Sequence, residues 1–89
     1  MAWSVEFHPA AEKELAALDK PIQRRIQRFI DDRLLKAADP RKLGQALTGE
    51  WSGHWKYRVG DWRMIARIRD QLVQIYIVKV GHRREVYER

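Results

Sequence analysis

Residues 55–65, with the sequence WKYRVGDWRMI, decide the fold of this chain. Apolar and basic residues alternate up to Gly60-Asp61, which supplies a turn signal, and a second strand follows the turn. Symmetric pairing about the turn places Arg58 directly opposite Arg63. The segment therefore predicts an antiparallel hairpin with its basic side chains on one face.

Two more strands are predicted outside this hairpin. Residues 3–7 alternate between apolar and polar side chains before Pro9, which is the period of a half-buried strand. A turn at Asp70-Gln71 follows the hairpin. Residues 72–80 are then almost continuously apolar and rich in Val and Ile, so we expect a central strand that is covered on both faces and ends at Gly81.

Two helices that begin at prolines separate the first strand from the hairpin. Pro9 occupies the first turn of a short amphipathic helix that runs to Asp19-Lys20. Pro21 begins a second helix, and Asp39-Pro40 ends it. The apolar stripe of the second helix consists of Ile22, Ile26, Phe29, Ile30 and Leu34. We expect the two helices to form an antiparallel hairpin that buries this stripe on another element.

The stretch from residue 41 to residue 53 contains three glycines and no clear period. It is predicted to be a packed connecting loop, with Leu43 and Leu47 as its contacts to the core. The element order is thus an N-terminal strand, a two-helix hairpin and a three-strand meander. This order predicts an α+β fold in which the helices pack on one face of an antiparallel sheet.

The composition fits one small basic domain spanning residues 1–89. The length of 89 residues excludes a two-domain enzyme, and the absence of cysteine excludes a disulfide scaffold and a thiolate metal site. The net charge is +6. Residues 54–89 hold 9 Lys and Arg against 4 Asp and Glu, while residues 1–53 hold 9 against 8. Such localised charge favours nucleic acid, phosphorylated lipid or an acidic protein, although an ordinary solvated surface explains it equally well. With neither a signal peptide nor a membrane span in the sequence, a cytoplasmic location is expected.

The basic residues of the hairpin gather on one face of the predicted sheet. Arg58 opposite Arg63 costs about 0.2–1 kcal/mol, and no acidic residue alternates with them to offset the repulsion. Arg67 has the parity of Arg63 and extends the patch. Two further residues, Arg83 and Tyr87, follow the central strand. They are four positions apart, so they lie on one side in either an extended or a helical conformation and complete this surface. The candidate site residues are Lys56, Arg58, Arg63, Arg83 and Tyr87.

Other residues with reactive or aromatic side chains favour structural roles. Of the three histidines, His8 caps a predicted helix and His54 begins a strand, which leaves His82 as the one candidate for proton transfer. The carboxylates of the basic half lie mostly at turns or in the tail, so neither a metal nor another cofactor is expected. The aromatic residues that fit core packing better than binding are Trp3, Trp55, Tyr57 and Trp62.

Four segments together form one pattern: residues 55–65, the sequence VGHRREVY at 80–87, the sequence FHPAAEKEL at 7–15, and the stretch from Asp39 to Gly49. This combination resembles the RelE branch of the RelE/ParE toxin superfamily over essentially the whole chain. The resemblance implies a RelE-like fold of the microbial ribonuclease type. It also implies the toxin of a type II toxin–antitoxin system, an endoribonuclease that cleaves messenger RNA in the ribosomal A site and inhibits translation.

The resemblance also assigns the active positions of the family to this chain. The first lysine of the basic strand corresponds to Lys56, the hairpin arginine to Arg63, the arginine after the last strand to Arg83 and the C-terminal tyrosine to Tyr87. Arg58 stands where the best-known pattern has lysine. This change keeps the charge but argues against proton transfer at that position, because arginine hardly titrates.

A metal-free cleavage requires a base for the 2′-hydroxyl, stabilisation of the phosphorane and a proton for the leaving oxygen. We expect Arg58 and Arg63 to clamp the phosphate and Arg83 to stabilise the transition state or assist the leaving group. Crowded cations favour the deprotonated forms of neighbouring lysine and tyrosine. Either Tyr87 or Lys56 is therefore a candidate for the base.

The resemblance implies partners as well as a reaction. They are messenger RNA with the ribosomal A site and an acidic, RelB-like antitoxin that masks the basic sheet, while DNA is contacted only through the antitoxin complex and no membrane is involved. The alternative is the ParE branch, which binds and inhibits DNA gyrase without cutting RNA. Retention of Lys56, Arg63, Arg83 and Tyr87 favours the nuclease. A plain RNA-binding module is disfavoured because the aromatic residues alternate onto the opposite sheet face.

Overall fold

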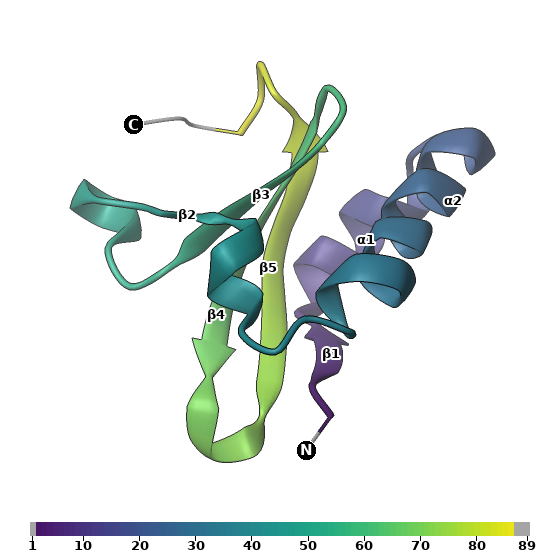
Figure 1. The fold of residues 1–89 in the computed structure, drawn as a ribbon. Coiled ribbons are helices and arrows are strands. Elements are labelled where there is room, and N and C mark those ends of the chain that lie inside the picture. Colours follow the sequence, from purple (N-terminus) through teal and green to yellow (C-terminus); the bar gives the residue numbers. More distant parts are fainter. Residues whose placement is uncertain (1, 87–89) are drawn as a thin grey trace.

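A computed structural model describes residues 2–86 of the chain. Two helices lie beside a twisted sheet, and a short arm that carries β2 projects from the opposite side (Figure 1). The elements in chain order are β1 (Ser4–Phe7), α1 (Pro9–Ala16), α2 (Lys20–Phe29), β2 (Gln45–Ala46), β3 (Trp55–Val59), β4 (Trp62–Arg69) and β5 (Gln74–His82). The predicted α+β class and the order of strands and helices are confirmed.

The sheet has five strands in the order β1-β5-β4-β3-β2 and is mixed, not wholly antiparallel. β1 runs parallel to β5, with Ser4 paired to Gln74 and Phe7 to Ile77, whereas the other neighbours are antiparallel. The two-residue strand β2 lies in the stretch predicted to be a loop. Alternation of apolar and polar residues identifies only strands of sufficient length, so the two-residue β2 is not visible in the sequence. Alternation also carries no information on the direction of the neighbouring strand, so the parallel pairing of β1 is not visible either.

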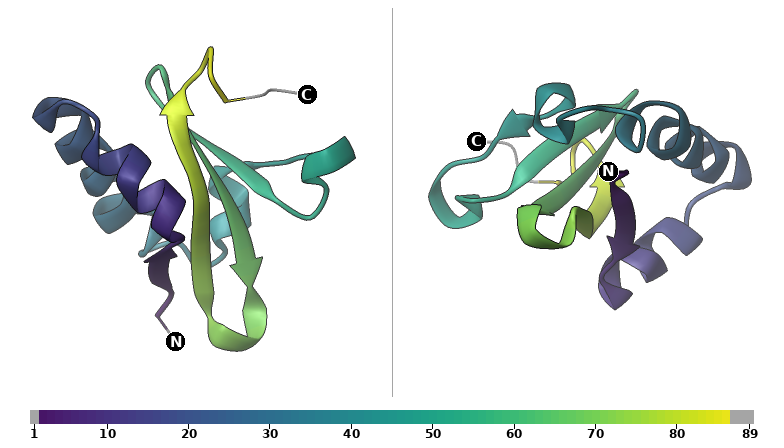
Figure 2. Two further views of the ribbon diagram at one scale, coloured as in Figure 1. Left: turned by 180° about the vertical axis from the view of Figure 1, so that it is seen from behind. Right: turned by 60° about the horizontal axis from the view of Figure 1, so that its bottom comes forward.

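Both helices begin where the prolines predicted. His8 caps α1 as expected, since its Nδ1 accepts a hydrogen bond from the Ala10 amide at 3.0 Å. A π-helical turn, Ile30–Leu34, extends α2 and keeps Ile30 and Leu34 buried with Ile26. The two helices cover one face of the sheet in both views of Figure 2. Within residues 2–86, neither is long and apolar enough to cross a membrane.

The two faces of the sheet carry separate apolar clusters. The main core joins the stripe of α2 to residues from β3, β4 and β5, and Trp3, Trp55, Trp62 and Leu43 pack against it. A smaller cluster on the opposite face consists of Leu47, Ile65 and Val86, with Trp51 and Val78 against them. The predicted packing role of the tryptophans is therefore confirmed. Leu47 is buried as predicted, but on the face away from the helices.

Tyr57 is a core residue whose hydroxyl group is tied to the backbone. Its side chain is fully buried, and its OH donates a hydrogen bond to the Pro40 carbonyl at 2.8 Å. Burial raises the pKa of this phenol well above its usual value. The group therefore holds the 3-10 turn Pro40–Leu43 against the core and takes no part in surface chemistry.

Replacing Tyr57 with phenylalanine is expected to flatten the alkaline end of the stability profile. The folded pKa of Tyr57 is raised, so wild-type stability is undiminished below about pH 10 and falls above it by about 1.4 kcal/mol per pH unit from this group. The variant loses this slope, and at neutral pH it loses about 1–3 kcal/mol because the Pro40 carbonyl is left without its donor. Urea unfolding between pH 7 and pH 11 measures both effects. Equal alkaline slopes in the two proteins would contradict this assignment.

Candidate functional site

The hairpin presents its basic side chains on the sheet face that the helices leave uncovered. The observed register pairs Arg58 with Arg63 and Lys56 with Ile65, which confirms the predicted pairing. On the other face of the same strands, Tyr57 lies in the main core. We call the face that carries Lys56, Arg58, Arg63 and Arg67 the basic face.

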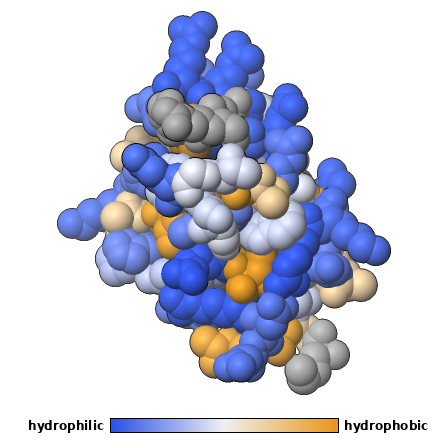
Figure 3. Space-filling view, turned by 90° about the vertical axis from the view of Figure 1, so that its left-hand side faces the viewer, coloured by the Kyte–Doolittle hydropathy of each residue, from blue (hydrophilic) through white to orange (hydrophobic). Residues whose placement is uncertain are grey.

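Figure 3 views the molecule from the side opposite the helices, where hydrophilic residues surround a small hydrophobic area. Ile65, fully buried in the smaller cluster, alternates with Arg63 and Arg67 along β4. Arg58 and Arg67 are exposed, and among residues 2–86 no carboxylate lies within ion-pair distance of either. The basic face therefore carries exposed positive charge above a buried apolar cluster, which suits a ligand with anionic groups.

Arg63 is held in place by the turn that precedes it. Its Nη1 donates hydrogen bonds to the carbonyls of Gly60 at 2.9 Å and Trp62 at 3.0 Å, and the residue is only 5% exposed. These bonds fix the guanidinium group on the turn, in a residue whose backbone pairs with that of exposed Arg58. A guanidinium fixed by its own backbone loses little conformational freedom when it binds an anion, so it is suited to holding a phosphate.

Two more arginines converge on the Gly60-Asp61 turn. The Arg83 amide donates to the Asp61 carbonyl at 2.8 Å, and its Nε lies 3.8 Å from Asp61 Oδ1. This ion pair is more than half exposed, so it contributes little to stability, and a phosphate can replace the carboxylate at low cost. The Arg25 guanidinium of α2 packs on the turn, only 2.8 Å from where a Gly60 Cβ would lie. Gly60 has a φ of 62°, so the backbone geometry of the turn favours glycine.

The segment after β5 folds back over the basic face. The amides of Glu85 and Val86 donate to the His82 carbonyl at 2.8 and 3.0 Å. Val86 is then buried against Ile65, above Gly81, whose missing side chain leaves room for it. The chain thus reaches the basic face at the residue before Tyr87. Tyr87 itself lies outside the described residues.

The structure separates His82 from the other candidates. His82 pairs with Trp62 across the sheet, and the two rings meet edge to face at 5.3 Å. Trp62 packs on the helical core, so His82 lies on the face opposite Arg58 and Arg63. Its Nδ1 also accepts a hydrogen bond from the Arg84 amide at 3.2 Å. The structure therefore does not bring His82 together with the residues of the basic face.

No metal site is formed by the part of the chain that the structure describes. Among residues 2–86, no group of three or more His, Asp or Glu side chains is arranged to hold an ion. The basic face brings together arginine and lysine, which are cations and not metal ligands. Its charged donors are suited to binding anions.

The arrangement of hairpin, helices and tail matches known proteins. A model of the ParE toxin family of type II toxin–antitoxin systems, parDE, matches residues 5–87. The chain belongs to the RelE/ParE superfamily of type II toxins. Toxin RelG of Mycobacterium tuberculosis is 29% identical over 89 residues, which cover all of both chains. The family resemblance seen in the sequence is confirmed.

Solved structures of RelE/ParE toxins share the fold. The RelBE2 toxin–antitoxin complex of Mycobacterium tuberculosis aligns with a TM-score of 0.84 and 27% identity over 92% of this chain and 99% of that one. The archaeal RelE–RelB complex of Pyrococcus horikoshii aligns with a TM-score of 0.71 and 27% identity over 97% and 100%. The isolated RelE toxin of Escherichia coli, 19% identical with a TM-score of 0.71 over 99% and 87%, has the same fold.

The arginine contacts around the hairpin turn were not predicted from the sequence. Arg25 lies on a helix whose exposed face is rich in arginine, so nothing in the pattern distinguishes it from its neighbours. Asp61 was assigned only to the turn, although it also anchors Arg83. A useful signal is the glycine of the turn itself, since a positive φ at Gly60 brings the chain close enough for contact by a side chain from another element.

Proposed function

We propose that this RelE/ParE toxin is an endoribonuclease that cleaves messenger RNA in the ribosomal A site and thereby inhibits translation. The observation that carries the proposal is the direct pairing of exposed Arg58 with Arg63, which is fixed by the Gly60 and Trp62 carbonyls. Two cations held at this spacing repel each other in the folded protein. A phosphate between them relieves the repulsion, and relieves it most when the phosphorane carries extra negative charge.

The proposed reaction uses the RNA's own 2′-hydroxyl and no metal. The base removes the 2′-hydroxyl proton, the 2′-oxygen forms a bond to phosphorus, and the bond from phosphorus to the 5′-oxygen breaks. The products are a 2′,3′-cyclic phosphate and a 5′-hydroxyl that has taken up a proton. Arg58 and Arg63 clamp the phosphate, and Arg83 stabilises the transition state or assists the departing oxygen. Tyr87 and Lys56 remain the two candidates for the base.

Dependence on the ribosome follows from the weakness of this acid–base set. A tyrosine has an ordinary pKa of about 10 and is a poor base at pH 7. Correct positioning of the 2′-hydroxyl and the phosphate compensates for a weak base, since well-oriented groups react as if highly concentrated. The ribosomal A site supplies that positioning, so cleavage of free RNA is expected to be slow.

We further propose an acidic antitoxin of the RelB type as the partner that masks the basic face in the cytoplasm. Two of the similar structures are complexes of RelE-like toxins with such antitoxins. The charge of +6 on this chain favours an acidic partner, and DNA would be contacted only through the complex. A gene beside this one that encodes a small acidic protein with a DNA-binding half would support the pairing.

Mapping messenger RNA ends after a brief pulse of expression tests the proposed function. Cuts within translated codons are expected for the wild-type chain and for Arg24→Glu, which changes an exposed arginine on α2. They are expected to disappear in Arg58→Glu, which changes an exposed arginine on the basic face. Intact transcripts together with a DNA-damage response would instead support inhibition of gyrase, the activity of the ParE branch.

A further inference from the structure

We propose a second RNA-binding subsite on the basic face, formed by Arg67, Arg69 and Tyr76 near the end of β4. It takes phosphates and bases of the same strand that is cut at Arg58 and Arg63. The inference rests on the proposed function and deepens it, because it gives the direction in which the RNA lies. The strand would run along β4, away from the hairpin turn.

The register places the subsite on the same face as the cleavage residues. β3 and β4 pair without interruption from Val59–Trp62 to Trp55–Ala66, so the alternation of β4 is intact there. The irregularity between Ile65 and Ala66 adds its extra residue, Val78, to β5. Arg67 and Arg69 therefore follow Arg63 on one face, about 13 and 20 Å along the strand at about 3.3 Å per residue.

Arg69 is already positioned by its neighbours. Its Cζ lies 4.1 Å from the centre of the Tyr76 ring, and its Nη1 donates a hydrogen bond to Gln74 Oε1 at 3.3 Å. Tyr76 is paired with Arg67 across the sheet, so all three side chains share the face. A guanidinium plane stacked on an aromatic ring is a ready surface for a nucleobase, and its outer N–H groups suit phosphate.

The charges near the subsite leave it positive. Asp70, the nearest acidic residue along the chain, is ion-paired with Arg41 at 2.5 Å. Glu6 is paired with Tyr76 on the far side, where β1 forms the edge of the sheet. Arg67 is exposed and, within residues 2–86, no carboxylate lies within ion-pair distance of it. The positive strip therefore runs along β4, and Glu6 on the edge strand β1 bounds it on one side.

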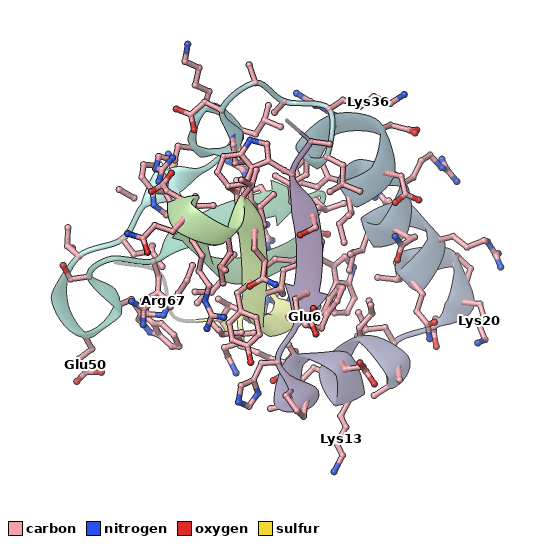
Figure 4. The ribbon with its side chains drawn as sticks, turned by 90° about the horizontal axis from the view of Figure 1, so that it is seen from below. Glu6, Lys13, Lys20, Lys36, Glu50 and Arg67 are labelled. Atoms are coloured by element: carbon pink, nitrogen blue, oxygen red, sulfur yellow. The ribbon has the colours of Figure 1, made fainter. Side chains whose placement is uncertain are left out.

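A shallow hollow adjoins these cations. It is lined by residues 67–72. Among the described residues, Leu72 is the large apolar residue classed as exposed, at 63%. Cations beside an exposed apolar side chain match the phosphate and the base of one nucleotide better than they match a carboxylate-rich peptide. Figure 4 shows Arg67 on the side away from the helices, whereas Lys13 and Lys20 extend from the helices.

The test measures the salt dependence of binding of a single-stranded RNA of about 12 nucleotides, fully 2′-O-methylated so that it is not cut. The full-length toxin is titrated by fluorescence anisotropy. Each lost phosphate contact lowers the slope of log affinity against log salt by about 0.7. The Arg67→Gln, Arg69→Gln double variant is therefore expected to lose about 1.4 from the slope. The Arg67→Lys, Arg69→Lys double variant is expected to keep most of the wild-type slope. The matched control is Lys13→Gln, Lys20→Gln on the helices, with no change expected.

The outcomes separate this inference from the proposed function. Arg58→Gln, measured in parallel, reports on the cleavage site alone. The second subsite is refuted, and the proposed function stands, if Arg58→Gln weakens binding while the Arg67→Gln, Arg69→Gln variant binds like the Lys13→Gln, Lys20→Gln control. If the wild-type toxin does not bind the RNA, the second subsite is refuted, whereas the proposed function, in which the ribosome positions the RNA, is decided by the mapping of messenger RNA ends. One RNA per toxin is expected, and two would refute a shared strand. Arg67→Gln alone, at an exposed position, provides the decisive comparison if Arg69→Gln disturbs folding.

Discussion

Single-turnover cleavage of messenger RNA on programmed ribosomes is expected to fall by about a hundredfold or more when Arg63 is replaced by glutamine. The variant removes the charge of a residue that is paired with Arg58 across the hairpin and is proposed to hold the phosphate. Glutamine keeps a donor for the Gly60 carbonyl, to which Arg63 Nη1 donates, so the turn is less disturbed than by a charge reversal at this 5% exposed position.

Stability measurements distinguish a catalytic loss from misfolding. Arg63→Gln should unfold within a few degrees of the wild type, and Arg24→Gln on α2 should match the wild type in both cleavage and stability. Cleavage by Arg63→Gln at the wild-type rate would remove this residue from the phosphate clamp. A large fall in the unfolding temperature would mean that the bonds to the turn, and not the charge, are its main contribution.

Removal of one oxygen atom at Tyr87 is expected to slow cleavage by at least about tenfold. Tyr87→Phe keeps the ring and deletes the hydroxyl group, so it removes a proton carrier or a hydrogen-bond donor from the proposed transition state. The neighbouring Val86 is buried on Ile65, which ties the chain to the basic face one residue earlier. Chemistry should therefore slow while binding of the ribosome is retained.

The two candidates for the base give different pH profiles. If Tyr87 is the base, Tyr87→Phe loses the rise of the cleavage rate toward alkaline pH, while Lys56→Gln retains it. If Lys56 is the base, Lys56→Gln loses the rise of the cleavage rate toward alkaline pH, while Tyr87→Phe retains it. Wild-type rates across the pH range in Tyr87→Phe would exclude this residue from the chemistry.

The sequence predicts the register of the basic face well because its decisive contacts lie within one hairpin. A two-residue turn leaves only one symmetric register, so Arg58 opposite Arg63 follows from counting residues. Burial of Arg63 does not follow, because it depends on hydrogen bonds to carbonyls that only the folded turn presents. The face of His82 depends on its pairing with Trp62 in a strand that the glycine at position 81 was expected to end.

Long-range pairing is the part of the fold that the pattern does not contain. The alternation at residues 3–7 correctly indicates a strand, yet its parallel partner lies about seventy positions further along. β2 is too short for any period to be visible, although it pairs Gln45 with Lys56. In each case the missing information is which distant backbone groups meet.

The parallel pair between β1 and β5 sets an order in time for making this toxin. β1 is synthesised first but has its partner only when residues 74–77 have been added, which takes on the order of several seconds at typical rates of translation. β4 likewise requires β5 on one side, and Val86 follows β5. A nascent chain that lacks β5 thus has no complete sheet to support the basic face, so the proposed cleavage is not expected before that strand is made.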